Sequence, residues 1–151
     1  MTAQSQVDEA HELDEGSWAY LSLWGLEQRD LHRHIVDACE ASGWPAVSWS
    51  PVAHEGNVTD SARFFEGMGH AVEHADVVIA LVDTSSAMTD AELAFAYRHN
   101  RPVIGLRVGG REEKPSPVQA MLRRYGRGRL IDCADIDECS AGLRDALADP
   151  E

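Results

Sequence analysis

The chain has 151 residues, and its 26 acidic and 13 basic side chains give a formal net charge of −13. This length is enough for one domain with its own core, and the negative charge argues against a nucleic acid polymer as partner, because phosphates would be repelled. The three cysteines, Cys39, Cys133 and Cys139, are irregularly spaced and predict neither a disulfide framework nor a metal knuckle.

Residues 1–16, MTAQSQVDEAHELDEG, lack a periodic apolar pattern and predict a flexible acidic tail before a single domain at 17–151. This start is the opposite of a secretory signal. No apolar run of the chain approaches the roughly 18 residues of a membrane span. We therefore expect a cytoplasmic protein with no membrane partner.

Short apolar runs alternate with amphipathic stretches over the rest of the chain. In chain order, the expected elements are a strand at 18–24, a helix at 29–43, a strand at 46–50, a helix at 61–75, a strand at 76–82, a helix at about 90–99, a strand at 102–108, a helix at 116–126, a strand at 128–133 and a helix at 135–148. This alternation predicts a single α/β domain, doubly wound and Rossmann- or flavodoxin-like, with a five-stranded parallel sheet.

The run DVVIALV at 76–82 is β-branched and continuously apolar, as in a central parallel strand. Open α/β sheets bind ligands beyond the carboxyl ends of their strands, near the point where the strand order reverses. The loops after 18–24 and 76–82 are expected to line that crevice. The second loop leads directly to Glu92.

Glu92 lies at the head of an otherwise apolar helix, in the stretch SSAMTDAELAFAYRHNRP. One interpretation is structural, since Thr89 and Glu92 fit the S/T-x-x-E capping box. The other is chemical: a carboxylate in the first helical turn stays ionised in the macrodipole field. Such a group suits glycosyl transfer, where a carboxylate traps or stabilises an oxocarbenium-like centre. The two interpretations are compatible.

Residues 19–148 resemble the nucleoside 2-deoxyribosyltransferase family, and are nearest to its short nucleotide N-glycosidase branch. The similar segments are AYLSLWG in the first strand and AVEHADVVIALVDTSSAMTDAELAFAYRHNRPVIGLRV in the middle. The resemblance implies cleavage or transfer of an N-glycosidic bond, by a hydrolase or a transferase, on a small nucleoside or nucleotide. It implies no metal and no organic cofactor. The segment SPVQAMLRR resembles the family's late helix, which reaches the neighbouring site in dimers, so a homodimer or larger homo-oligomer is expected.

The resemblance places Glu92 at the catalytic glutamate, as nucleophile or oxocarbenium stabiliser. It places Ser86 near the sugar or phosphate. Tyr20 matches an aromatic residue that lines the pocket, although a core role is the alternative. The substrate-binding residues expected on these grounds are Tyr20, Gly25, Asp83, Ser86 and Thr89. Asp83 is expected near a ribose hydroxyl or, alternatively, in a loop turn.

Two positions depart from the family pattern. The family's second acidic residue falls on Met68, and the neighbours Glu66 and His70 point about 200° away from it on an ideal helix. The phosphate loop reads LWGLEQRD, in which Glu27 would disfavour a phosphate, so a nucleoside or a modified ligand is a better fit than a monophosphate. These departures leave a second hypothesis, a catalytically degenerate nucleotide- or nucleoside-binding module. A third is a flavodoxin-like interaction domain that dimerises through apolar faces.

Two further motifs have structural interpretations. His70 to His74 spells H-x-x-E-H, a zinc-protease signature, but solvent-facing side chains are expected because the motif supplies too few ligands. The basic segment RRYGRGR at 123–129 is expected to balance a helix C-terminus, with a phosphate clamp for a neighbouring subunit as the alternative.

Overall fold

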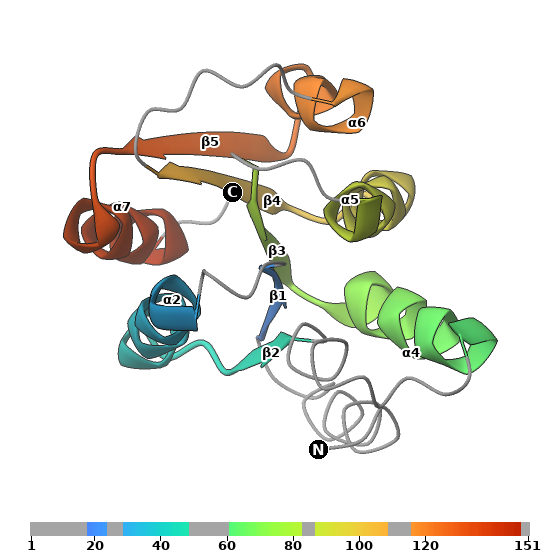
Figure 1. The fold of residues 1–151 in the computed structure, drawn as a ribbon, viewed down its shortest axis with the longest axis horizontal. Coiled ribbons are helices and arrows are strands. Elements are labelled where there is room, and N and C mark those ends of the chain that lie inside the picture. The colour runs from blue at the N-terminus through green and yellow to red at the C-terminus, as the bar shows by residue number, and fades with distance from the viewer. Residues whose placement is uncertain (1–17, 24–28, 49–60, 83–86, 109–115, 149–151) are drawn as a thin grey trace.

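The computed structural model contains a five-stranded parallel sheet with the strand order β2-β1-β3-β4-β5 (Figure 1). It describes residues 18–23, 29–48, 61–82, 87–108 and 116–148. The strands are β1 (Ala19–Ser22), β2 (Ala46–Ser48), β3 (Val77–Leu81), β4 (Val103–Val108) and β5 (Gly128–Cys133). The helices are α2 (Arg29–Ala41), α4 (Ser61–His74), α5 (Ala87–Arg98), α6 (Pro117–Ala120) and α7 (Ile136–Ala148). The predicted α/β class and parallel sheet are confirmed.

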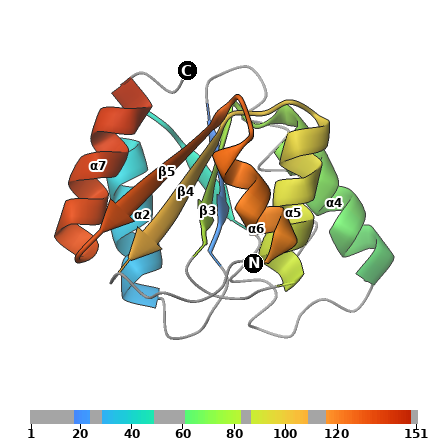
Figure 2. The ribbon, with the colours of Figure 1, turned by 90° about the horizontal axis from the view of Figure 1, so that it is seen from above.

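Helices cover both faces of the sheet. α2 and α7 lie on one face, and α4, α5 and α6 lie on the other (Figures 1 and 2). Every residue of β1 and β3 is buried, as expected for central parallel strands with both faces covered. Because successive side chains alternate, Leu21 packs towards α2 and α7, whereas Tyr20 packs towards α4 and α5.

The helix that carries Glu92 begins earlier than expected. α5 starts at Ala87, so Thr89 and Glu92 are its third and sixth residues. The capping-box interpretation is therefore wrong, since Thr89 is not the residue that precedes the helix. The placement of Glu92 in the first helical turn is wrong for the same reason: Asp90 is the acidic residue of that turn, and Glu92 lies in the second, where the field of the macrodipole is weaker. Ala87 and Met88 are good helix formers, which explains the additional residues.

The helix expected at 116–126 is much shorter. α6 has four residues, and a 3₁₀ turn over Met121–Arg123 follows it. This turn packs tightly onto the sheet: a β-carbon at Gly105 would lie 2.4 Å from Leu122 Cδ2, and one at Gly128 would lie 2.7 Å from Leu122 Cδ1. The glycines thus make room for Leu122, and the chain turns back towards β5 instead of extending the helix.

The other strands and helices agree with their expected ranges to within a few residues. The predicted tail at 1–16 lies outside the described residues. None of the three cysteines forms a disulfide bond, and all three are buried. Within the described part of the chain, no helix is long and apolar enough to cross a membrane.

Candidate functional site

Glu92 is a fully buried carboxylate beside the central strands. Its Oε1 accepts a hydrogen bond of 3.0 Å from the hydroxyl of Ser22, the last residue of β1. Strand β1 lies between β2 and β3. The connection after β1 leads to β2 on one side, and the connection after β2 leads back to β3 on the other side, so the strand order reverses at β1. Ionisable side chains are almost never fully buried without a partner. A buried carboxylate at this reversal point is therefore a strong candidate for chemistry.

Tyr20 lies two residues before Ser22 on the same face of β1, and it is also fully buried. Its hydroxyl lies near the Glu92 carboxylate, but outside ordinary hydrogen-bond geometry with any described residue. Burial raises the pKa of Tyr20 well above 10.0, and the negative charge of Glu92 raises it further. Tyr20 therefore stays protonated at neutral pH and presents a neutral O–H beside the carboxylate.

Sequence reasoning missed Ser22. A usable signal was present, because Ser22 is a small polar residue at the end of a buried strand, two positions after Tyr20. Alternation alone places these two side chains on one face. What the sequence could not supply is the identity of the helix that packs there.

The other predicted site residues fall into two groups. Thr89 is buried and lies three residues before Glu92, hence on the same side of α5. Gly25, Asp83 and Ser86 lie outside the described residues.

Met68 is fully buried in the same cluster as Tyr20, and Glu66 is exposed. The position where the sequence resemblance implies a second acid thus faces the interior, where this chain has a thioether. Helix α4 is continuous despite its glycines. A β-carbon at Gly69 would make only ordinary contact with Phe95 Cε1, at 3.4 Å, so the packing of α4 near α5 does not require a glycine at this position.

The ring centroids of His70 and His74 are 4.4 Å apart on α4; His74 is exposed, as expected, whereas His70 is only partly exposed. Glu73 Oε1 lies 3.9 Å from Nδ1 of His99, which follows the last residue of α5. Among the residues that the structure describes, no three His, Cys, Asp or Glu side chains are grouped to hold a metal ion.

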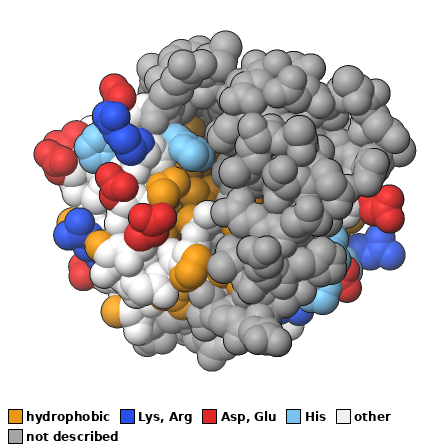
Figure 3. Space-filling view, turned by 90° about the horizontal axis from the view of Figure 1, so that it is seen from below, with side chains coloured by type: hydrophobic (Ala, Val, Ile, Leu, Met, Phe, Trp, Pro, Cys, Tyr) orange, Lys and Arg blue, Asp and Glu red, His pale blue; other side chains and the backbone are white. Residues whose placement is uncertain are grey.

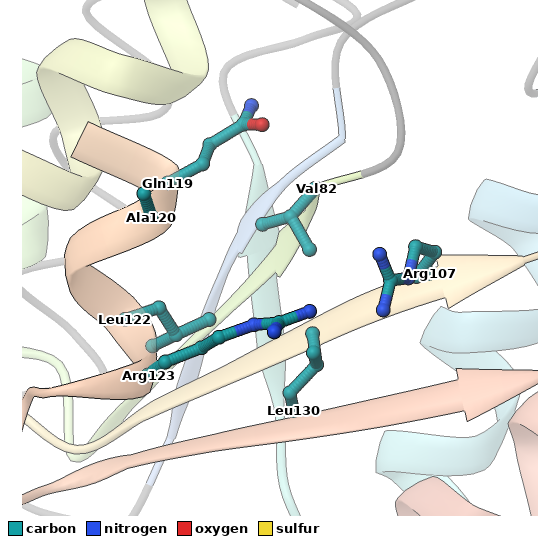
Figure 4. Close-up of a pocket in the computed structure, with 7 residues that line it drawn as sticks. All are labelled: Val82, Arg107, Gln119, Ala120, Leu122, Arg123 and Leu130. Atoms are coloured by element: carbon teal, nitrogen blue, oxygen red, sulfur yellow. The ribbon is translucent and has the colours of Figure 1, made fainter. Parts of the chain in front are cut away.

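A pocket of about 340 Å³, open solvent at its mouth included, lies between the sheet and the 3₁₀ turn (Figure 4). Val82, Leu122 and Leu130 form its apolar lining. Arg107 and Arg123 bring two guanidinium groups to it, and Gln119 lies at its rim. Of these residues, sequence reasoning noted only Arg123, within the basic segment at 123–129.

Two other residues of that basic segment hydrogen-bond to the chain that follows α5. Arg127 Nη1 donates a 2.6 Å hydrogen bond to the carbonyl of Asn100, and the Tyr125 hydroxyl donates one of 2.6 Å to the carbonyl of Arg101. Both contacts satisfy carbonyls just beyond α5, where Asn100 has a φ of 56°. Elsewhere, over the described part of the face in Figure 3, acidic and basic side chains are interspersed.

No protein-family model matches the chain, and no curated protein matches it in sequence. Solved structures do match. A CMP N-glycosidase from Clostridium botulinum, BcmB, has a TM-score of 0.61 at 16% identity, over 84% of this chain and 98% of that chain. A phosphoheptose isomerase from Francisella tularensis has a TM-score of 0.56 at 17% identity, over 98% of this chain and 83% of that chain. A conserved protein from Enterococcus faecalis V583 has a TM-score of 0.52 at 15% identity, over 87% of this chain and 98% of that chain. The chain therefore shares the α/β fold of these proteins, one of which is an N-glycosidase.

Proposed function

We propose that this protein cleaves or transfers the N-glycosidic bond of a small nucleoside or nucleotide, with Glu92 as nucleophile or oxocarbenium stabiliser. One observation carries the proposal: a fully buried carboxylate, oriented by Ser22, lies where the strand order of the sheet reverses. The structural similarity to a CMP N-glycosidase supports the same chemistry.

In the proposed reaction, the bond between C1′ and the base nitrogen breaks and its electron pair leaves with the base. Glu92 stabilises the positive charge that develops at C1′, or forms an ester bond with it. Water or a second base then attacks C1′ and releases the carboxylate. No step requires a metal or an organic cofactor.

Each neighbour of Glu92 has a distinct task in this scheme. Ser22 donates to Oε1 and fixes the plane of the carboxylate. Tyr20, whose pKa is raised well above 10.0, is too weak an acid to protonate the leaving base, so it serves as a neutral hydrogen-bond donor. The proton for the base must come from another group or from solvent.

A second candidate function is a binding module that has lost catalysis. Met68 favours it, because this buried residue occupies the position where the resemblance implies a second carboxylate. Glu92 would then contribute to ligand binding alone.

Purified protein incubated with nucleosides and their monophosphates distinguishes these functions. Free base detected by chromatography supports the glycosidase, and exchange onto an added second base identifies a transferase. Saturable binding without base release supports the binding module. Neither turnover nor binding across the panel contradicts both.

A further inference from the structure

Cys133 and Cys139 have no role in the scheme above, and they lie on the face of the sheet that α2 and α7 cover. Cys133 is the last residue of β5, and Cys139 is the fourth residue of α7. Both residues are buried, with exposed fractions of 4% and 1%. Two different elements therefore bring these thiols into one part of the core.

Helix α7 packs closely on β5 along the surface that carries both thiols (Figure 1). Ile131 and Cys133 are two residues apart in β5, so their side chains share one face of the strand. Cys139 and Gly142 are three residues apart in α7 and lie on one side of the helix. A β-carbon at Gly142 would lie 3.1 Å from Ile131 Cγ2, closer than ordinary contact, so the glycine lets the helix approach the strand. The same approach brings Cys139 towards Cys133.

The turn between β5 and α7 holds the start of the helix in this position. Asp135 Oδ1 accepts a hydrogen bond of 2.8 Å from the N–H of Glu138, and the Asp135 carbonyl accepts one of 3.1 Å from the N–H of Cys139. Asp135 thus caps α7 and fixes the backbone of its first turn.

The two thiols are hydrogen-bonded to each other. Burial raises the pKa of the Cys133 thiol, and the hydrogen bond with the Cys139 thiol opposes this rise. The sulfur atoms are therefore in direct contact inside the core. Buried cysteines often serve as small apolar side chains, a role that needs no second thiol. Here, two of the three cysteines of the chain meet.

We propose that Cys133 and Cys139 are a redox-active thiol pair, which closes to a disulfide and pins the start of α7 to the end of β5. The sulfur atoms of a disulfide are about 2.05 Å apart, so two thiols that are already in contact need only a small further approach. The cross-link would join two residues that α7 and β5 already hold side by side.

The oxidant is hydrogen peroxide, because a small molecule reaches a buried pair more readily than a bulky disulfide does. The thiolate of Cys133, the more exposed residue, attacks one peroxide oxygen; the O–O bond breaks, a sulfenic acid forms, and the other oxygen takes up the thiol proton and leaves as water. The Cys139 sulfur then attacks the Cys133 sulfur, and the S–O bond breaks with release of a second water. Two thiols and one peroxide thus give one disulfide and two waters.

Peroxide treatment of the whole folded protein, followed by peptide mass mapping, tests the proposal. Trypsin cleaves after Arg129 and Arg144, so both thiols fall in one peptide, 130–144, which excludes Cys39. After oxidation, the protein is unfolded and its remaining thiols are alkylated. We expect peptide 130–144 without label and about 2 Da lighter, because two hydrogen atoms are lost, and two labels after reduction with dithiothreitol. The melting temperature should rise on oxidation, because the cross-link restricts the unfolded chain.

The matched control is Cys39→Ala, because Cys39 is buried on the same face but belongs to α2. This variant should form the same disulfide. Cys139→Ala, with Cys139→Ser as a second variant, should show neither the loss of two hydrogen atoms nor the rise in melting temperature. Circular dichroism checks that each variant is folded before oxidation. Met121, which is 55% exposed, reports through its sulfoxide that the oxidant has acted.

The proposal is overturned if Met121 is oxidised while peptide 130–144 keeps both thiols, gains only oxygen atoms or becomes linked to Cys39. A disulfide that leaves the melting temperature unchanged would contradict the pinning of α7. None of these results depends on base release, so a failure here leaves the proposed function to its own test.

Discussion

The two faces of the sheet differ in what they bury. Towards α2 and α7, the buried side chains that the structure describes are aliphatic residues and cysteines. Towards α4, α5 and α6 they include the four buried polar residues of the described chain, namely Ser22, Thr89, Glu92 and Gln119. Strand β1 contributes to both, since Leu21 packs into the aliphatic face and Tyr20 faces Glu92.

This difference separates stability from function within one small domain. The aliphatic face needs only shape and apolar area, which stabilise the fold without specific partners. The polar face must hold a carboxylate away from water, which destabilises the fold unless donors are supplied. Sequences keep such groups where chemistry requires them. Substitutions on the two faces should therefore have different effects on stability and on activity.

The largest effect on stability is expected on the aliphatic face. Leu143→Ala in α7 removes a fully buried side chain and should lower the free energy of unfolding by about 2–5 kcal/mol. Base release per folded molecule should not change. Urea unfolding followed by circular dichroism measures the first quantity. A loss of activity in the molecules that remain folded would show that the faces are not independent.

Ser22→Ala should have a smaller effect on stability and a clear effect on activity. It removes a hydrogen bond to a buried carboxylate, worth about 1.5–3 kcal/mol. The matched control is Ser42→Ala. The hydroxyl of Ser42 donates to the carbonyl of Ala38 at 2.9 Å, at the end of α2, and its removal should lower the free energy of unfolding by about 1 kcal/mol. We expect base release to fall only in Ser22→Ala. Equal activity in both variants would argue against orientation of Glu92 by Ser22.

The pH dependence of stability sharpens the comparison further. The folded pKa of Tyr20 is raised above 10.0, so its neutral form contributes stability below that pH, and this contribution is lost as the pH rises towards the folded pKa. Tyr97, with a pKa raised to about 12, acts in the same direction. Tyr20→Phe should therefore reduce the alkaline loss of stability by up to about 1.4 kcal/mol per pH unit. If both proteins lose stability equally with each pH unit above about pH 10, Tyr20 does not contribute to the alkaline loss of stability.

Asp132→Asn should have the smallest effect. The side chain of Asp132 is 60% exposed, so its ion pair with Arg107 should contribute less than about 1 kcal/mol. Because the folded pKa of Asp132 is lowered, this contribution is present at neutral pH and disappears as the pH falls through that pKa. The free energies of unfolding of the variant and the unchanged protein, measured at neutral and acidic pH, should become equal in acid. A difference that persists in acid would point to a role outside the ion pair.

The sequence predicted the fold well because strand burial is a local property. The run at 76–82 is apolar throughout, and β3 is buried throughout. Glu92 was also found from the sequence, because a carboxylate among apolar residues is visible without any structure. Contacts between distant elements were not predictable. Ser22 and Glu92 are 70 residues apart, and only the packing of α5 on β1 brings them together.

The errors in helix boundaries have the same origin. The helix expected at 116–126 stops early because Leu122 packs against Gly105 of β4, a tertiary contact that helix propensity does not reflect. Arg107 was overlooked because it lies within a strand, and its meeting with Arg123 depends on that same turn.

The most direct test of the central claim is the paired measurement of stability and base release in Glu92→Gln. The amide keeps an oxygen that accepts from Ser22 and removes the buried negative charge. We predict a melting temperature equal to or above that of the unchanged protein, with base release reduced by roughly a thousandfold or more. Undiminished release, or a loss of stability as large as that of Leu143→Ala, would mean that Glu92 serves the fold and not the reaction.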